Sequence, residues 1–245
     1  MSRIAIFGAT SAIAQEAARL FAAEGGQLFL VGRDTGRLAA VAADLTARGA
    51  RGVATHATDL ADPHGHEAAV TKALAYLGGL DGVLIAHGVL PVQSEVQDDP
   101  AATLAALQVN FLSPASLLTA LAPVFERSRA GVICVIGSVA GDRGRPSNYV
   151  YGAGKGGLDT FLQGLRARLA KSGVRVITVK PGFVDTPMTA SIRKNPLFAS
   201  AAAVGRGIHR AMRRGADVIY LPWYWRWIML IIRLIPERLF KKLSL

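Results

Sequence analysis

This chain of 245 residues has a single cysteine, and its sequence shows no pattern of a secretory leader. The one cysteine, Cys134, cannot form an intrachain disulfide, so nothing in the sequence indicates an oxidising compartment. It lies in the apolar run GVICVIGS, which favours a buried position on a strand. The N-terminus enters an apolar strand pattern directly, without a charged leader or a hydrophobic segment of signal length. We therefore expect a cytoplasmic protein.

Clusters of residues that could hold a metal ion are also missing from the sequence. The pair His64 and His66 in DPHGHE has no cysteine or further histidine beside it. A solvated helix start explains this pair better than a metal site does. We predict no metal.

Acidic residues are too few to balance the basic ones. The chain has 17 Asp and Glu against 28 Lys and Arg, a formal net charge of +11. Residues 205–245 hold nine Lys or Arg against two acids, Asp217 and Glu237, which leaves +7 in this tail. A basic tail fits nucleic acid, an anionic membrane or plain solubility, and net charge alone does not choose among them.

What the sequence does contain is a regular alternation of strand-length apolar runs with helical patterns. With 51% apolar and 18% charged residues, the chain can bury a full core and fits one large α/β domain. We expect strands in RIAIFG, QLFLVG, GVATHA, GVLIAHG, GVICVIG, VRVITVKPG and DVIYLP. We expect helices over 12–23, 35–48, 63–77, 101–127, 149–171 and 200–214. This order predicts a Rossmann-type fold, a doubly wound parallel seven-stranded sheet, with an irregular stretch at 182–199 where a mobile lid would fit.

The turn after the first strand has fewer glycines than a dinucleotide-binding loop normally has. In IFGATSAIAQ only Gly8 remains, and Ala12 and Ala14 stand where two more glycines are expected. Thr10 and Ser11 offer hydroxyls and a helix N-cap. Taken alone, the pattern fits a plain strand-to-helix turn as well as it fits a cofactor loop. The evidence for chemistry has to come from elsewhere in the chain.

A serine, a tyrosine and a lysine have a spacing that suits carbonyl chemistry. Ser138 follows the fifth strand, Tyr151 lies thirteen residues later, and Lys155 lies one helical turn beyond Tyr151 on the same face. An adjacent ammonium is expected to lower the pKa of a tyrosine from its usual value of about 10 toward neutral pH. Ser138 can then bind the substrate carbonyl while Tyr151 protonates the developing alkoxide. Tyr-x-x-x-Lys alone is common by chance on helix surfaces, but together with a serine at this spacing after a strand the pattern is far more specific.

At these residues the sequence resembles the classical short-chain dehydrogenase/reductases, and the likeness covers essentially the whole chain. The resemblance implies a catalytic tetrad of Asn110, Ser138, Tyr151 and Lys155, in which Asn110 of QVNFLSP holds a proton-relay water. Lys155 would also bind the nicotinamide ribose. Departures from the family pattern stand in the first turn at Phe7, Ala12 and Ala14, and after the fourth strand at Ile85, Ala86 and His87.

The same resemblance implies a set of cofactor contacts. Asp59 would lie beside adenine, and the segment KPGFVDT would lie beneath nicotinamide. His87 is expected to pack or to hydrogen-bond the backbone, because the tetrad already supplies the proton. The implied contacts are Gly8, Thr10, Ser11, Ala12, Ile13, Arg33, Asp59, Leu60, Ala86, His87, Gly88, Tyr151, Lys155, Pro181, Gly182, Val184 and Thr186.

The end of the second strand bears on the choice of cofactor. LFLVGRDTGR places Arg33 where the adenosine ribose would lie, with Arg37 one helical turn later. An acid there would accept hydrogen bonds from a free 2′-hydroxyl, whereas an arginine pairs with a 2′-phosphate. Asp34, one residue further on, keeps NADH open as the alternative. We expect NADPH (NADP+) and, in a reducing cytoplasm, reduction of a carbonyl.

A narrower likeness concerns the substrate. The runs GATSAIA, AHGVLP and YGAGKGGLD and the tail are similar to a subgroup of the family that contains decaprenylphosphoryl-keto-pentose reductases, which reduce a 2-keto sugar on a polyprenyl phosphate. This likeness implies a ketoreductase of a lipid-linked ketone, and the family resemblance implies a homodimer or homotetramer. The alternatives are a soluble alcohol or hydroxysteroid dehydrogenase and a nucleotide-sensing protein on the same fold. The complete Ser138, Tyr151 and Lys155 set disfavours a sensor.

The tail itself is expected to lie on a membrane surface rather than to span it. Residues 1–217 are taken as the reductase domain, and 218–245 as the last strand and an apolar, basic helix. The longest uncharged piece after Arg226 is only Trp227 to Ile232, whereas a span needs about 20 residues. On a helical projection, Ile228, Ile231, Ile232 and Ile235 lie opposite the charged residues, which predicts a helix in the headgroup plane over 223–243, kinked at Pro236. The protein would then be peripheral at the inner face of the membrane. Packing against another subunit stays open, and no nucleic acid is expected.

Overall fold

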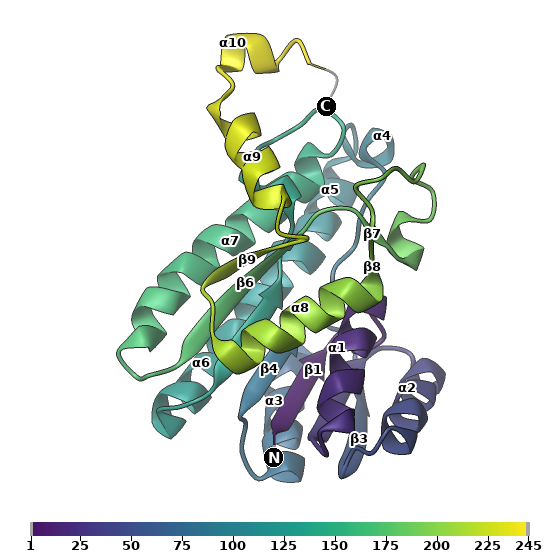
Figure 1. Cartoon of the computed structure of the whole chain (residues 1–245), viewed down its shortest axis with the longest axis vertical. Coiled ribbons are helices and arrows are strands. Elements are labelled where there is room, and N and C mark those ends of the chain that lie inside the picture. Colours follow the sequence, from purple (N-terminus) through teal and green to yellow (C-terminus); the bar gives the residue numbers. More distant parts are fainter. Residues whose placement is uncertain (1, 244–245) are drawn as a thin grey trace.

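The computed structural model describes residues 2–243, and its centre is a sheet of seven parallel strands (Figure 1). The strand order is β3-β2-β1-β4-β5-β6-β9, which is the doubly wound Rossmann arrangement expected from the sequence. All seven expected apolar runs form strands of this sheet. Their bounds are β1 Arg3–Phe7, β2 Gln27–Gly32, β3 Gly52–Ala57, β4 Gly82–Ile85, β5 Val132–Ile136, β6 Arg175–Pro181 and β9 Val218–Leu221.

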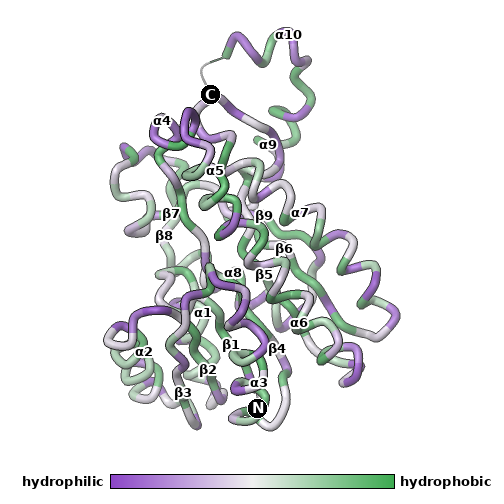
Figure 2. Tube along the Cα trace, turned by 180° about the vertical axis from the view of Figure 1, so that it is seen from behind, coloured by the Kyte–Doolittle hydropathy of each residue, from purple (hydrophilic) through white to green (hydrophobic). Residues whose placement is uncertain are grey.

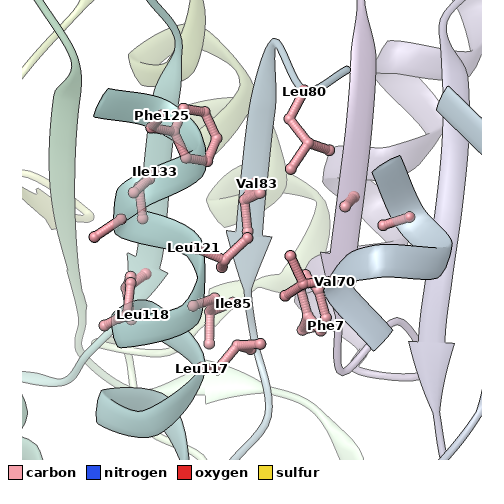
Figure 3. Packing of buried hydrophobic residues seen from close by; sticks show 14 of the residues in the cluster. Phe7, Val70, Leu80, Val83, Ile85, Leu117, Leu118, Leu121, Phe125 and Ile133 are labelled. Atoms are coloured by element: carbon pink, nitrogen blue, oxygen red, sulfur yellow. The ribbon is translucent and has the colours of Figure 1, made fainter. Parts of the chain in front are cut away.

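Helices cover both faces of the sheet, so the strands are buried on both sides. One face packs against α1 (Ala12–Ala23), α2 (Thr35–Ala47) and α8 (Ala201–Arg214). The other face packs against α3 (His66–Leu77), α6 (Ser113–Ser128) and α7 (Tyr149–Ala170). Figure 3 shows the second interface, in which Leu117, Leu121 and Phe125 of α6 lie against the strands. These two apolar cores fix the carboxyl ends of the strands, where ligands bind in such folds.

The long helix expected over 101–127 is divided in the structure. Helix α5 (Pro100–Leu107) passes through a π-helical turn, η2 (Gln108–Leu112), into α6. By length and composition alone, the segment Pro100–Ser128 is the one helix among the described residues that could cross a membrane. In the fold it packs on α3 and α7 and contributes core residues. Core helices of water-soluble proteins pass the same test, so this segment is weak evidence for a span.

The helix expected over 63–77 begins with a 3-10 turn, η1 (Pro63–Gly65), before α3. Several other short elements were not predicted. They are α4 (Gln93–Val96), η3 (Val139–Asp142) and η4 (Pro187–Thr189), together with the two-residue strands β7 (Val184–Asp185) and β8 (Ala199–Ser200). The parallel pair β7–β8 closes the base of the segment that was expected to be irregular. The stretch over 182–199 is therefore a loop with a fixed base.

The C-terminal segment forms α9 (Trp225–Leu234) and α10 (Glu237–Phe240), with the break at Pro236 where a kink was expected. In Figure 2 both helices carry hydrophobic and hydrophilic residues, whereas the central strands are largely hydrophobic. The expected division of α9 into faces is wrong. Ile228 and Ile232 pack inward with Trp225 and Met229 against Val139. The outward side is also apolar, with Trp227, Leu230, Ile231 and Leu234 exposed.

Candidate active site

Ser138, Tyr151 and Lys155 meet where β5 ends and α7 begins. Ser138 caps η3, and its Oγ accepts a hydrogen bond from the Ala140 N–H at 3.0 Å. The Ser138 side chain also lies close enough to the Tyr151 hydroxyl to influence its pKa. The Lys155 Nζ lies 5.9 Å from the centre of the Tyr151 ring and donates to the Ile136 carbonyl at 3.0 Å. The structure thus brings these three predicted residues together.

A glycine makes this close approach possible. A Cβ added at Gly141 would lie 2.8 Å from the backbone N of Gly156 and 2.8 Å from the backbone C of Lys155. Such distances are too short for any side chain, so the loop after Ser138 and the helix carrying Lys155 can touch only because residue 141 is glycine. The run VAGD therefore positions Ser138 against α7.

Asn110 lies in the same place, in the π-helical turn η2, and is buried. Its Oδ1 accepts from the Val89 N–H at 3.1 Å, and its Nδ2 donates to the carbonyls of Val89 at 2.9 Å and Ala106 at 3.0 Å. A Cβ on Gly88 would come 3.0 Å from the Asn110 Oδ1 and 3.4 Å from the Lys155 Nζ. Asn110 therefore holds the loop after β4 beside Lys155. That it also holds a water stays a prediction.

The expected lowering of the tyrosine pKa is wrong for this structure. Burial raises the pKa of Tyr151 above its ordinary value, and the nearby Ser138 hydroxyl offsets this only in part. Burial also lowers the pKa of Lys155 to about 8, because a dry environment disfavours the ammonium. Tyr151 is therefore protonated at neutral pH, which is the form that can give a proton to an alkoxide.

The first-strand turn fits a dinucleotide despite its alanines. Gly8 has a φ of +86°, and a Cβ there would lie 2.5 Å from the His87 backbone N, so this glycine cannot be replaced. Helix α1 begins at Ala12, and its N-cap Ser11 makes no side-chain capping bond. No acidic residue lies in its first turn. The N–H groups of Ala12 and Ile13 are thus available to an anion such as a pyrophosphate.

The adenosine end of the site lies at the ends of β2 and β3. Arg33 is exposed directly after β2, and Arg37 donates to the Thr10 carbonyl at 3.3 Å. Asp34 caps α2, because its Oδ1 accepts the Arg37 N–H at 2.9 Å. Asp59, after β3, accepts the Ala61 N–H at 3.0 Å. The carboxylate of Asp34 therefore has a structural use of its own, while the Arg33 side chain is exposed.

His66 and His87 both differ from a surface histidine. His66 was expected in a solvated helix start, but it is buried, and its Nε2 contacts the carbonyl of Leu60 at 3.0 Å. His87 contacts the Ser113 hydroxyl at 2.8 Å, and burial lowers the pKa of His87 to about 3. A neutral His87 cannot donate a catalytic proton as an imidazolium. Residues 2–243 contain no group of three or more His, Cys, Asp or Glu that could hold a metal ion.

The loop after β6 carries the remaining predicted contacts. Pro181 ends β6, Val184 is buried in β7, and Thr186 is the N-cap of η4. The indole of Trp225 occupies the space that a side chain on Gly182 would fill. The tail helix α9 therefore packs directly on the predicted nicotinamide segment. No local pattern in the sequence links residues 182 and 225, so this contact could not be predicted.

A buried ion cluster was also missed. The Lys180 Nζ contacts Asp142 Oδ1 at 2.6 Å and Asp159 Oδ2 at 2.8 Å, and the Tyr220 hydroxyl donates to Asp142 Oδ2 at 2.8 Å. Burial alone would lower the pKa of Lys180, but its hydrogen bonds to the two carboxylates raise it above the ordinary value. The cluster joins the loop after Ser138 to α7, β6 and β9. A lysine inside the apolar strand VRVITVKPG was the available signal, since a buried charge needs a partner.

Arg143 connects the same loop to the tail. Its Nη1 donates to the carbonyls of Ile232 and Ile235, each at 2.6 Å, and its Nη2 to Glu237 at 2.9 Å. The guanidinium also lies 3.7 Å from the centre of the Phe240 ring. The end of α9 is thus capped by a residue of the loop that carries Ser138.

A Rossmann-type sheet with this serine, tyrosine and lysine at its carboxyl edge defines an oxidoreductase with a nicotinamide-type nucleotide cofactor. The sequence profile of the short chain dehydrogenase family matches residues 2–197, so the chain belongs to the short-chain dehydrogenase/reductase family. It is 35% identical to an uncharacterized oxidoreductase of Mycobacterium tuberculosis, over 98% of this chain and 96% of the relative. It is 33% identical to an uncharacterized oxidoreductase in the mprA 5′ region of Streptomyces coelicolor, over 97% and 94%. It is 31% identical to dehydrogenase/reductase SDR family member 7B of Bos taurus, over 83% and 66%.

Proposed function

We propose that the protein is an NADPH-dependent carbonyl reductase. The proposal rests on the assembly of Ser138, Tyr151 and Lys155, because this set can bind a carbonyl oxygen and deliver a proton to it. Gly8, the first turn of α1 and the loop after β6 would hold the cofactor. When bound there, a reduced nicotinamide supplies the hydride that the carbonyl carbon accepts.

Binding of the carbonyl, delivery of the proton and binding of the ribose would fall to Ser138, Tyr151 and Lys155. The Ser138 hydroxyl donates to the carbonyl oxygen and orients it, and the Tyr151 hydroxyl gives that oxygen its proton as negative charge develops. Lys155 uses one of its three N–H donors on the Ile136 carbonyl, which leaves two for a ribose. The Tyr151 proton goes to the product alcohol, so the tyrosine must regain a proton before the next turnover.

The preference for NADPH is supported by the end of β2. One oxygen of Asp34 caps α2, and the exposed Arg33 side chain directly after β2 is a cation that can pair with a 2′-phosphate on the ribose. A guanidinium pairs well with a phosphate and adds little to binding of a neutral hydroxyl. Oxidation of NADPH and of NADH measured against a panel of ketones tests the function. Failure of every ketone to accelerate oxidation of either cofactor would contradict it.

We further propose that the ketone is carried on a lipid and is reduced at the inner face of a membrane. The likeness of the tail to lipid-linked keto-sugar reductases supports this, and so does the exposed apolar side of α9. Lipids that copurify with the protein can be extracted, identified and offered as substrates together with NADPH. If soluble ketones are reduced efficiently and no extracted lipid is, the protein is a soluble alcohol or hydroxysteroid-type dehydrogenase instead.

A further inference from the structure

A groove on the surface, whose lining includes none of Ser138, Tyr151 and Lys155, has no part in the chemistry described so far. It has a volume of about 390 Å³ and runs between α8 and the edge strand β9. Arg210 and Arg214 line it from α8, and Trp223 and Arg226 line it from the start of the tail. Its remaining lining is apolar or small apart from Tyr220, and no acidic residue contributes to it.

The arginines that line this groove, and Arg206 beside them on α8, have no acidic partner among the residues that the structure describes. Arg206, Arg210 and Arg214 follow one another at intervals of four residues, so they form a stripe along α8. Among residues 2–243 none of them, and not Arg226, forms an ion pair with an acid. Like charges at this spacing destabilise a helix. The helix dipole stabilises the positive charge of Arg214 in the last turn of α8, but Arg206 and Arg210 lie before that turn and receive no such stabilisation.

Exposed apolar side chains begin at the mouth of the same groove. Trp223 is 71% exposed, and beyond it Trp227 is 56%, Ile231 65% and Leu234 72% exposed on the outer side of α9. Tryptophan and aliphatic side chains next to arginines are typical of surfaces that insert into the headgroup region of a bilayer. Because Trp223 and Arg226 line the groove, phosphate binding and insertion can take place on one surface.

We infer that this groove binds the phosphate groups of anionic lipids and thereby holds the α8–α9 surface against an anionic bilayer. A second copy of the chain is a poorer occupant, because a two-fold contact would place these arginines against themselves. Nucleic acid would leave the aliphatic side of α9 without a partner. The inference specifies how the proposed action at a membrane would be achieved, but it does not depend on the catalytic chemistry.

The test is sedimentation of the full chain with phosphatidylcholine vesicles that contain or lack phosphatidylglycerol. The groove variant carries Arg210→Gln, Arg214→Gln and Arg226→Gln. The matched control carries Arg127→Gln, Arg129→Gln and Lys171→Gln, which remove the same charge from exposed positions at the C-terminal ends of α6 and α7, across the sheet. We expect the groove variant to bind phosphatidylglycerol vesicles on the order of a hundredfold more weakly than the control does. Binding should also weaken with added salt.

Equal binding by the two variants would overturn the assignment, provided that their thermal unfolding midpoints match. Glycerol 3-phosphate supplies a phosphate group without a bilayer. If glycerol 3-phosphate stabilises the wild-type protein and competes it off the vesicles, the groove is a site for small anions. The inference that it binds the α8–α9 surface to a bilayer is then wrong. If no vesicle is bound and light scattering shows a dimer that the groove variant loses, the surface is a subunit interface. Vesicle binding without reduction of any ketone would leave the groove in place and contradict only the catalytic proposal.

Discussion

At the scale of single residues, the Tyr151 hydroxyl is the atom on which the chemistry depends. Tyr151→Phe removes the proton donor but leaves the ring and its surroundings, so kcat is expected to fall about a hundredfold or more while the Kd for NADPH changes little. Stopped-flow reduction and fluorescence titration measure the two quantities. Tyr149→Phe, at an exposed position one half-turn earlier, is the control and is expected to keep normal rates. A Tyr151→Phe enzyme that retains more than about a tenth of the rate would show that another group donates the proton.

Arg33 decides the choice of cofactor in the proposed function. Arg33→Ala should weaken NADPH binding by roughly ten- to a hundredfold, the range expected for a hydrogen bond to a charged group, and should leave NADH binding nearly unchanged. Titration of both cofactors measures the difference, with Arg127→Ala as a distant control. Similar losses for NADPH and NADH would mean that Arg33 does not contact a 2′-phosphate.

The sequence predicted which residues would lie together where local spacing fixes their positions, and their chemical roles stay predictions. Ser138, Tyr151 and Lys155 were brought together as expected, because a strand end and one helical turn fix their positions. The pKa of Tyr151 was misjudged, because it depends on how deeply the fold buries the hydroxyl. Likewise His66 sits at a helix start in the sequence, but only the packing of α3 on α6 shows that it is buried.

At the scale of elements, the free energy of unfolding should depend strongly on the charges of the buried Lys180 cluster. Lys180→Met leaves Asp142 and Asp159 without their cation in a buried place, so the free energy of unfolding is expected to fall by about 3 to 5 kcal/mol. Denaturant titration measures the loss. Because Asp142 ends the turn that follows Ser138, kcat should fall as well.

The control for the Lys180→Met prediction is a variant that breaks a solvent-exposed ion pair. Lys194→Met breaks the exposed contact with Asp185, which should cost less than about 1 kcal/mol. Adding Asp142→Asn to Lys180→Met should restore part of the lost stability, because one uncompensated carboxylate disappears. If the single and double variants are equally unstable, the loss reflects packing of the lysine stem rather than charge.

Elements with strong periodic patterns were predicted from the sequence, and those determined by distant contacts were not. The seven strands follow from runs of apolar residues between turn residues. The π-helical turn at Asn110 lies four residues before Pro114, which has no N–H to donate to the Asn110 carbonyl. The prediction of one helix over 101–127 did not use this signal. The inner face of α9 could not be identified either, because both sides of this helix are apolar and its packing on Val139, Gly182 and Phe183 decides which side is covered.

At the scale of the whole molecule, His87 should make stability depend on acid. Its pKa is about 3 in the folded chain and 6.5 ordinarily, so between these values the unfolded chain binds more protons. The free energy of unfolding should therefore be unaffected by this group above pH 6.5 and should fall as the pH drops toward 3. The loss is expected to be about 2 to 4 kcal/mol, less than the full shift in pKa would give, since His87 as a residue is only half-buried.

His87→Gln should make the protein less sensitive to acid over this window, because glutamine does not titrate. Thermal unfolding midpoints recorded between pH 7 and pH 4 measure the effect. His64→Gln, at an exposed position, should follow the wild-type curve. If His87→Gln and wild type lose stability in parallel, another group causes the acid sensitivity.

Arg143 holds α9 almost entirely through main-chain oxygens, those of Ile232, Arg233 and Ile235. A main-chain oxygen is present whatever the side chain, so this attachment does not depend on which residues the helix carries. Over evolution, the outward residues of α9 can be exchanged without loosening the loop that carries Ser138. The surface that such a protein presents to its surroundings is therefore free to diverge among descendants while the catalytic serine keeps its place.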